Sequence, residues 1–528
     1  MDGFLPTRMI DVGHIGDSSI CLVEGNDCAG GTLYIALSHC WGNSQPLQLT
    51  QSTATRLRAG VVLTELPKTF QDAILVTRKM RIRYLWIDSL YVVPGQVICT
   101  SPLTRYRCII QDDPQDWHRE AACMQDVYSR AICCIAATAA KNGDIGLFFD
   151  RDPQGLMPFE VDTSKARIYG GKTDEPLMTY DIHSELLTPA NSIDNAPLNQ
   201  RAWVAQERYL STGVIHFTRE LLFWECRESV TSEQDPDGRF IERSSMWRGD
   251  SAVHELKSKI YDFKSQLANV SGGPASVDWR KILSRLHQEW CHFRNEYSGL
   301  KLTKEEDIFV ALNGIAQAVA EVTNDTLIAG LWKDRMIEDL CWRRLTRDFV
   351  HPINAPPKPS TWRAPTWSWA SINRIIEGHA LWWERESTLG MMNETAVLKD
   401  ITVNQKPSGQ VMNASVTLTC RLMPIFPPNS VIGKWVPYEV TVVLDDCTIT
   451  NARDLCDEIS MVILRHRESR TEGEGSVQGL LVTPSRLKAG SYERVGYFDF
   501  TPDSEDRSIL QSILDGFHNA QEKTIELI

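Results

Sequence analysis

The first third of the chain alternates compact apolar runs with segments of helical periodicity. Residues 34–38, 84–88 and 131–137 are apolar runs of strand length, and the first two end in polar side chains. Between them, residues 66–77 and 116–128 repeat apolar side chains every three to four positions, which is typical of amphipathic helices. Strands that alternate with helices predict a parallel sheet flanked by helices, and therefore an α/β fold.

Local signals mark where these helices begin. Pro67 suits a first helical turn, because its fixed φ fits a helix and its missing N–H would be unpaired there in any case. Asp116 suits an N-cap, because its carboxylate can accept a hydrogen bond from a free N–H of the first turn. Further on, residues 199–207 predict another helix, and strands are predicted at 214–217 and 221–226.

The rest of the chain changes character twice. Residues 251–350 are predicted to be helical, and residues 351–394 are a connector rich in Trp and Pro. Short alternating segments in residues 395–528 predict a small β-rich unit that ends in a helix. Residues 1–33 are predicted to be a strand-rich lead-in, and the polar stretch 228–250 to be an exposed loop or linker.

Composition limits the classes of protein and of partner. The chain has 528 residues, of which 42% are hydrophobic and 23% charged, so it is predicted to be globular with three folding units. Its net charge of −13 argues against electrostatic binding of nucleic acid or of an anionic membrane. No apolar run approaches the roughly 18 residues of a membrane span, and no signal-peptide pattern is seen, so we expect a cytoplasmic protein without a membrane span.

The cysteines and phosphate-loop motifs give no sign of a cofactor. The 14 cysteines are expected to stay reduced in the cytoplasm. The chain has no Cys-x-x-Cys pair, and Cys133 next to Cys134 lacks the spacing of a zinc ribbon. We therefore expect no metal. A GxGxxG or Walker loop is also missing, so no bound cofactor is assigned.

Three motif blocks follow one another in the first half of the chain. The first is Tyr-Ile-Ala-Leu-Ser-His-Cys-Trp-Gly at 34–42. The second joins Leu-Pro-Lys-Thr-Phe-Gln-Asp-Ala-Ile at 66–74 to Ile-Arg-Tyr-Leu-Trp-Ile-Asp-Ser-Leu at 82–90. The third is Arg-Ala-Trp-Val-Ala-Gln-Glu-Arg at 201–208. In this order, the blocks resemble the heterokaryon-incompatibility (HET) domain of fungal proteins.

The resemblance assigns residues 34–227 to a HET domain and implies a function in fungal nonself recognition and vegetative incompatibility. It implies a programmed-cell-death effector or signalling module that acts by self-association or with another incompatibility protein. The family is distantly similar to Toll/interleukin-receptor (TIR) domains, which implies a flavodoxin-like parallel sheet. An accessory function in an unrelated pathway is a further alternative.

Residues 91–107 depart from the family pattern, which runs directly from a leucine such as Leu90 to a cysteine such as Cys108. Back-translation permits splice-donor and splice-acceptor sequences at the ends of this atypical insertion. We interpret it as a retained intron, and the alternative is a genuine loop insertion, which proteins tolerate well. Sequencing of the transcript distinguishes the two.

The resemblance also implies an enzymatic alternative, because some TIR domains cleave NAD with a glutamate on a helix. Trp117 and Glu120 stand in a similar Trp-then-Glu order, one residue shorter, which makes Glu120 the candidate catalytic residue and NAD a candidate substrate. A carboxylate stabilises the oxocarbenium charge that develops as the nicotinamide–ribose bond breaks. The other interpretation of Glu120 is an acid that stabilises the start of its helix.

The remaining candidate residues follow the strand ends or stand in the third block. Ligands of open parallel sheets bind at the carboxyl ends of strands, where Ser38, His39 and Asp88 are predicted to lie. The polar residues 201–208 either contact a ligand or form an internal ion-pair network, and we favour the network. The candidate site-lining residues are Ser38, His39, Trp41, Asp88, Trp117, Arg201, Trp203, Glu207 and Arg208.

Overall fold

The computed structural model of the chain describes residues 4–42, 60–88, 114–151, 159–162, 179–182, 188–237, 251–269, 279–344, 359–373, 376–377, 393–406, 408–424, 440–445, 459–467, 476–500 and 507–528. The chain divides into two units, Met1–Ser258 and Lys259–Ile528, where its length had suggested three. The helical and β-rich regions that the sequence separates therefore belong to one unit. The insertion at 91–107 lies outside the described residues.

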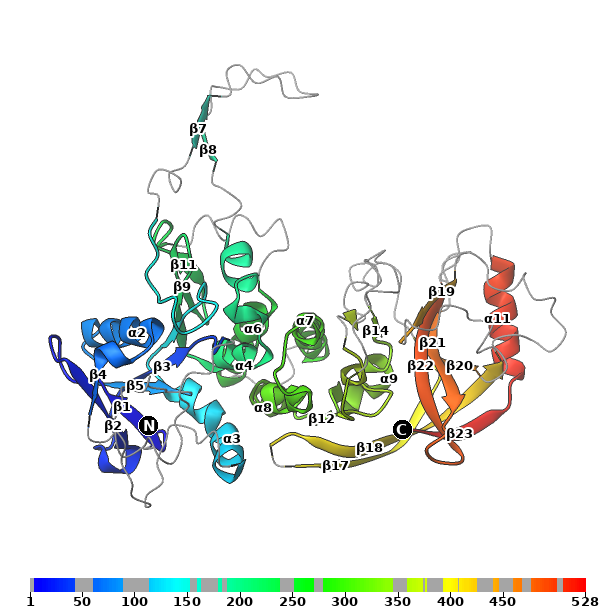
Figure 1. Ribbon diagram of the computed structural model, residues 1–528. Helices are drawn as coiled ribbons and strands as arrows, with labels where there is room; N and C mark the ends of the chain where they lie inside the picture. Colours follow the sequence, from blue (N-terminus) through cyan, green and yellow to red (C-terminus); the bar gives the residue numbers. More distant parts are fainter. Residues whose placement is uncertain are drawn as a thin grey trace. The chain divides into compact units, whose positions relative to one another are not determined.

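A nine-stranded sheet is the centre of the first unit (Figure 1). Its strands are β1 (Arg8–Asp11), β2 (Ser19–Glu24), β3 (Tyr34–Ser38), β4 (Val61–Val62), β5 (Tyr84–Ile87), β6 (Cys134–Ala136), β9 (Gly213–Phe217), β10 (Leu222–Cys226) and β11 (Val230–Ser232). They follow the order β11-β10-β9-β6-β3-β5-β1-β2-β4. Strands β5, β3, β6 and β9 run parallel to one another, which confirms the predicted parallel arrangement of residues 34–38, 84–88 and 131–137.

Helices cover both faces of these parallel strands, which is why the strands are continuous apolar runs. The helices are α2 (Lys68–Lys79), α3 (Pro114–Arg130) and α4 (Ala202–Leu210). The Tyr34 hydroxyl donates to the carbonyl of Val127 in α3 at 2.6 Å. His39 is an odd number of residues after Tyr34, so its side chain points to the other face of the sheet. Its ring centroid lies 4.9 Å from that of Phe70 in α2. Side chains alternate across a strand, so α2 and α3 lie on opposite faces, as Figure 1 shows.

The structure corrects several local predictions in this unit. Strands β1 and β2 lie in the segment predicted to be a strand-rich lead-in and belong to the same sheet, because β1 pairs antiparallel with β5. Strand β11 lies in the stretch expected to be a loop, since three residues carry too little periodicity to be recognised. Helix α3 begins at Pro114, so Asp116 lies within its first turn and is not its N-cap. Pro67 directly precedes α2, and its carbonyl accepts the N–H groups of Phe70 and Gln71.

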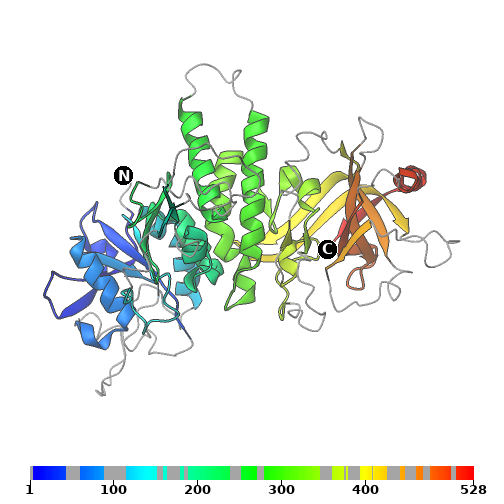
Figure 2. The same cartoon turned by 90° about the horizontal axis from the view of Figure 1, so that it is seen from above.

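The second unit begins with helices, as predicted for residues 251–350. They are α6 (Ala252–Asn269), which contains the boundary between the units, α7 (Trp279–Ser298), α8 (Val310–Thr323) and α9 (Met336–Asp339). Figure 2 shows α6 and α7 as two long green helices side by side. Aromatic rings join them, with Phe263 and Trp279 at 5.6 Å between ring centroids. Further along α7, the ring of Trp290 packs against Trp332 at 5.1 Å.

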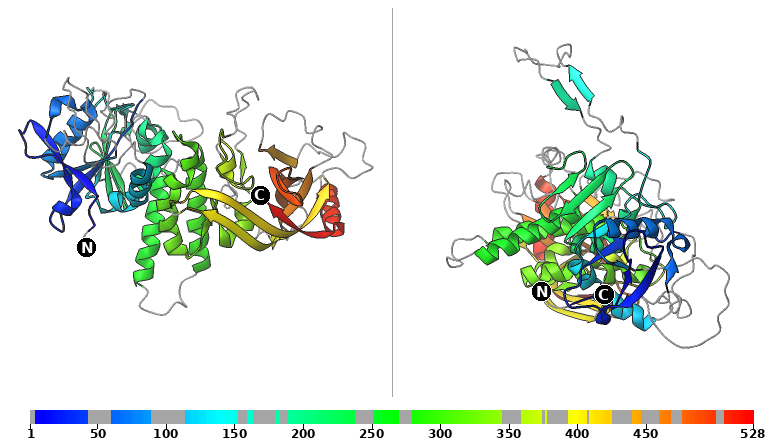
Figure 3. Two further views of the ribbon diagram at one scale, coloured as in Figure 1. Left: turned by 60° about the horizontal axis from the view of Figure 1, so that its bottom comes forward. Right: turned by 90° about the vertical axis from the view of Figure 1, so that its left-hand side faces the viewer.

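An eight-stranded, mainly antiparallel sheet forms the rest of this unit, as the alternating pattern predicts. Its strands are β16 (Asn393–Glu394), β17 (Val397–Gln405), β18 (Val411–Pro424), β19 (Val440–Leu444), β20 (Ser460–Arg467), β21 (Ser476–Pro484), β22 (Ser491–Phe500) and β23 (Glu522–Leu527). Because β18 pairs with both β23 and β20, the path β20-β21-β22-β23-β18 closes into a barrel. The final helix α11 (Arg507–Asn519) buries Phe517 and Ile513 against it. Figure 3 shows β17 and β18 as a long yellow ribbon.

Short elements connect these layers. They are β7 (Phe159–Asp162), β8 (Thr179–Ile182), β12 (Leu327–Ile328), β13 (Leu331–Trp332), β14 (Arg343–Arg344), β15 (Ile376–Glu377), the 3-10 turns Gly25–Asp27, Leu63–Glu65, Leu198–Gln200, Glu305–Ile308, Lys333–Arg335 and Trp369–Ser371, and the π-turn Ala190–Asp194. Within the described part of the chain, no helix has the length and apolar character to cross a membrane.

Candidate functional site

Two neighbouring parallel strands bring polar side chains to the carboxyl edge of the first sheet. Leu37 of β3 is paired with Ile87 of β5, so the next residues, Ser38 and Asp88, leave the sheet side by side. Ser38 is buried on the face covered by α3 and α4, and His39 is buried toward α2. The strand-end residues of the sequence analysis therefore meet at one edge but from both faces of the sheet.

Asp88 connects the loops that follow the two strands. Its Oδ2 accepts a hydrogen bond from Trp41 Nε1 at 3.0 Å, and its Oδ1 lies 3.5 Å from His39 Nδ1. The Asp88 side chain keeps 13% of its surface exposed while that of His39 keeps 1%, so the carboxylate lies at the rim of the group. An ionised carboxylate at this position can accept hydrogen bonds from a bound molecule as well as from the protein.

Arg201 adds a positive charge at the same edge, just before α4. Its Nη1 donates to the carbonyl of His39 at 2.5 Å, and its guanidinium lies 5.7 Å from the centroid of the Trp41 ring. Burial lowers the pKa of His39 to about 4, against the opposing effect of Asp88 and with a smaller contribution from Arg201. His39 is therefore a neutral imidazole near pH 7.

Glu207 enters the group from the second turn of α4, and its side chain is buried. Burial, helped by the negative charge of Asp88, raises the pKa of its carboxyl group to about 7. Arg201 and the neighbouring hydroxyl groups of Ser38 and Tyr128 act in the opposite direction. Glu207 consequently stands near half protonation at neutral pH, beside a second carboxyl group.

The chemistry available at this edge follows from these charges. Two neighbouring carboxyl groups can give and accept a proton when one of them is protonated and the other is ionised. The guanidinium of Arg201 can bind a phosphate or carboxylate, and the Trp41 ring offers a flat apolar surface beside it. The term edge cluster is used below for Ser38, His39, Trp41, Asp88, Arg201 and Glu207.

Glu120, the candidate catalytic residue, is buried in an ion pair. Its Oε1 lies 3.6 Å from Arg8 Nη2 and 3.8 Å from Arg119 Nε. The Glu120 and Arg8 side chains are only 3% and 4% exposed. Arg8 begins β1, which runs antiparallel to β5, so the pair lies toward the carboxyl end of β5. The ion pair joins α3 to the sheet, a role that the sequence did not suggest.

Arg208, the neighbour of Glu207, belongs to an internal ion-pair network. Its Nε donates to Glu225 Oε2 at 2.7 Å, and its Nη1 donates to Asp194 Oδ1 at 2.6 Å. His216 Nε2 lies 3.2 Å from the same Glu225 oxygen. Although burial raises the pKa of Glu225, Arg208 and His216 hold it well below its usual range. The contacts of Arg208 are therefore those of an internal ion-pair network, the alternative to a ligand contact for the third motif block.

The two remaining candidates are tryptophans. Trp203 is partly buried and packs against the apolar core of the sheet. Trp117 lies in the first turn of α3, and its side chain is outside the described residues. The edge cluster thus unites six of the candidates, whereas Arg208, Trp203 and Glu120 make other contacts.

Tyr128 is the functional-site neighbour that sequence reasoning missed. It occupies the apolar face of α3, and periodicity assigns it only to the core. Its ring packs edge-on against Trp86 at 5.5 Å, and its hydroxyl donates to the carbonyl of Leu37 at 3.5 Å. Burial and the nearby charge of Glu207 raise the pKa of the hydroxyl well above its usual range. The polar hydroxyl of a tyrosine on an otherwise apolar helical face was the sequence feature that could have identified it.

Comparison with known proteins agrees with the motif blocks. Residues 34–95 and 105–207 match the family model of the heterokaryon incompatibility protein (HET). The match skips residues 96–104, which lie within the atypical insertion. The curated proteins and the solved structures gave no match. The resemblance that rested on three short motif blocks is therefore confirmed for this part of the chain.

Proposed function

Because residues 34–207 carry a HET domain, we propose that this protein is a cytoplasmic effector or signalling module of nonself recognition in heterokaryon incompatibility. Its HET domain would act by self-association or on another incompatibility protein, and the edge cluster would be the site that controls this activity. The observation that carries the proposal is the meeting of all three motif blocks at one edge of the sheet.

The edge cluster draws its members from the whole motif set. Ser38, His39 and Trp41 come from the first block, Asp88 from the second, and Arg201 and Glu207 from the third. Burying charged and ionisable groups costs free energy that an apolar core would not incur. A fold that gathers such groups from distant segments supports selection for binding or chemistry at this place.

The order of the parallel strands supports a TIR-like sheet. Across the sheet the four parallel strands lie in the order β5, β3, β6, β9. In chain order β3 is the first and β5 the second, so the order is second, first, third, fourth, as in doubly wound flavodoxin-like sheets. In such sheets, ligands bind at the carboxyl ends of the strands where the order reverses. The reversal here is at β3, whose last residue is Ser38.

The enzymatic alternative is an NAD glycohydrolase, and the edge cluster suggests how it would differ from the sequence-based assignment. Glu120 can reach a substrate only by leaving its buried ion pair with Arg8, which costs free energy. Asp88 is partly exposed at the rim, and Glu207 beside it has a carboxyl pKa that burial raises to about 7. If NAD is cleaved, we expect Asp88 and Glu207 to matter more directly than Glu120.

Expression of the full chain in fungal cells tests the proposal. We expect growth arrest with the natural sequence, and loss of arrest with Asp88→Asn or Glu207→Gln at equal protein abundance. Glu228→Gln is the matched control, because Glu228 is an exposed carboxylate of the same unit. Normal growth with the natural sequence, or arrest unaffected by both edge variants, would contradict the proposal.

Measurement of NAD in the same cells separates the two mechanisms. Arrest without NAD loss supports action through association, and light scattering of the purified chain should then show assembly that rises with concentration. NAD loss that disappears in Glu207→Gln supports the enzyme. Glu120→Gln is the discriminating variant, because a catalytic Glu120 requires NAD cleavage to vanish while the folded fraction stays unchanged.

A further inference from the structure

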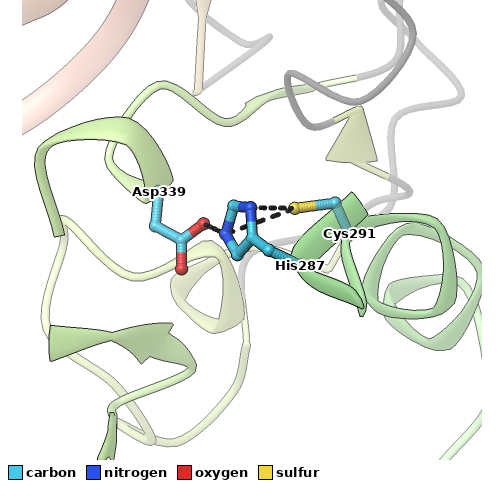
Figure 4. A group of neighbouring side chains, drawn as sticks. All are labelled: His287, Cys291 and Asp339. Atoms are coloured by element: carbon cyan, nitrogen blue, oxygen red, sulfur yellow. Dashed lines mark hydrogen bonds and ion pairs between the residues drawn. The ribbon is translucent and has the colours of Figure 1, made fainter. Parts of the chain in front are cut away.

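Three side chains with different ligand atoms converge inside the second unit, in a region that the HET match does not cover (Figure 4). His287 and Cys291 are four residues apart on α7, so they share one face of that helix. Asp339 ends the short helix α9 and points at the same spot. All three side chains are buried, and their ligand atoms lie within 4.8 Å of one another.

The distances among these atoms resemble the edges of a tetrahedral metal site. His287 Nε2 lies 2.9 Å from Asp339 Oδ1 and 3.7 Å from Cys291 Sγ. With zinc–nitrogen and zinc–oxygen bonds of about 2.0–2.1 Å and zinc–sulfur bonds of about 2.3 Å, tetrahedral edges are about 3.3 Å between N and O and about 3.6 Å between N and S. Cys291 Sγ lies 4.0 Å from Nδ1 as well as 3.7 Å from Nε2, so the thiol would turn toward the Nε2 side of the ring to share an ion with His287 and Asp339.

The surroundings hold the carboxylate of Asp339 in place. Its Oδ2 accepts the backbone N–H of Trp332 at 2.8 Å, and its Oδ1 lies 3.4 Å from Arg294 Nη1. Partners of this kind orient a ligand carboxylate and are typical of the second layer around protein metals. Trp290, next to Cys291, is fully buried and packs on Trp332, which keeps bulk water from the cluster.

We propose that His287, Cys291 and Asp339 form a structural site for a divalent transition-metal ion of the zinc class, with water as the fourth ligand. The mixture of thiolate, imidazole and carboxylate favours zinc over magnesium or calcium, which take oxygen ligands alone. Binding forms three bonds from the ion to the protein in place of hydration waters, and it releases the Cys291 thiol proton and the Nε2 proton of His287, whose ring keeps a proton on Nδ1. No oxidation is involved. The ion would join α7 to α9 within this unit and is independent of the function proposed for the HET domain.

The alternative is a metal-free network in which His287 and Arg294 simply pair with Asp339. It predicts that Cys291 is a bystander, because the thiol is a weak hydrogen-bonding group. A metal site instead makes the thiolate indispensable. Cys291→Ser is therefore the informative substitution, and Cys420→Ser is its matched control, a buried thiol in β18 of the same unit.

Zinc titration of the purified full chain, with elemental analysis after gel filtration, tests the proposal. We expect about one zinc ion per chain for the natural sequence and for Cys420→Ser, and a loss of at least tenfold in affinity for Cys291→Ser. Zinc should raise the unfolding temperature of the natural protein by several degrees, because it binds the folded state, and a chelator should reverse this.

Cobalt(II) provides a test on the natural sequence that does not depend on how the variants fold. Bound by Cys291, it should give a thiolate-to-cobalt charge-transfer band in the near ultraviolet, retained in Cys420→Ser. Absence of this band, or zinc far below one ion per chain, would overturn the proposal. Equal zinc binding by Cys291→Ser and the natural protein would do the same.

Discussion

Burial shifts the pKa values of two groups of the edge cluster, Glu207 and His39, in opposite directions. For Glu207 it raises the pKa to about 7, so this group stabilises the fold below pH 4.5 and loses its contribution as the pH rises toward 7. For His39 burial lowers the pKa to about 4, so its contribution is present above pH 6.5 and is lost as the pH falls toward 4. As the pH rises from about 4 to about 7, the fold therefore loses the contribution of Glu207 and gains that of His39.

Substituting one member should expose the effect of the other. Glu207→Gln should gain stability relative to the natural protein as the pH rises from about 4.5 to 7, by roughly 3 kcal/mol at most. His39→Gln should gain relative stability as the pH falls from about 6.5 to 4. Denaturant unfolding over this pH series measures both differences.

The exposed carboxylate Glu228 provides the control for this experiment. Glu228→Gln removes an exposed carboxyl group from the same unit, so it shows the effect of losing a carboxyl group that is not buried. A Glu207→Gln curve with the same pH dependence as the Glu228→Gln curve would show that burial does not shift the titration of Glu207 in the folded chain.

At the scale of single residues, the sequence indicated which polar groups follow the strands but not their partners. Ser38 and Asp88 were recognisable because each ends an apolar run. Arg8 as the partner of Glu120 was not, because Arg8 reaches it through the antiparallel pairing of β1 with β5. Asp339 was equally hidden as a partner of His287, since a long stretch of chain separates them.

At the scale of elements, strong periodicity identified the central strands and the helices, whereas short elements escaped it. The runs at 34–38 and 84–88 are buried on both faces, so nearly every residue is apolar. Strands such as β11 are stabilised by their neighbours rather than by their own pattern. The insertion at 91–107 and the proposed origin of its codons remain predictions, because they fall outside the described residues.

Two glycines of the second unit lie in turns between strands and differ in the space around them. Gly330, between β12 and β13, has a φ of +88°, and an added Cβ would lie 2.5 Å from Trp369 Nε1. Gly490, between β21 and β22, has a φ of +84° and nothing within 4 Å of such a Cβ. Both positions disfavour other residues, but only Gly330 is also sterically closed.

We therefore expect Gly330→Ala to destabilise the second unit by about 1–3 kcal/mol more than Gly490→Ala. Both variants share the cost of a positive φ, so the difference reports the close contacts with the Trp369 and Phe309 rings. Chemical unfolding of the two variants measures it. Equal losses would mean that Trp369 moves away at no cost.

At the scale of the whole molecule, the chain divides into two units, each with buried apolar residues of its own. In the first unit they lie between the parallel sheet and its helices, and in the second among helices and a closed barrel. Separate cores favour separate cooperative transitions. The sequence suggested more units because its pattern changes wherever helices give way to strands, which does not require a domain boundary.

Calorimetry of the full chain should accordingly resolve two unfolding transitions. Gly330→Ala should lower the temperature of one of them, and Glu207→Gln at pH 7 should shift the other. The reason is that each substitution lies within one core. A single transition that moves with both substitutions would show instead that the two units unfold as one.

The sequence by itself determined the alternation of strands and helices, the motif blocks and their family, because these depend on neighbouring residues along the chain. Only the tertiary structure decided which groups meet. Strand register brings Ser38 beside Asp88, and helix packing buries Glu207 next to both and Glu120 against Arg8. The physical reason is that burial and charge pairing, which set the chemistry of these groups, arise from contacts between segments far apart in sequence.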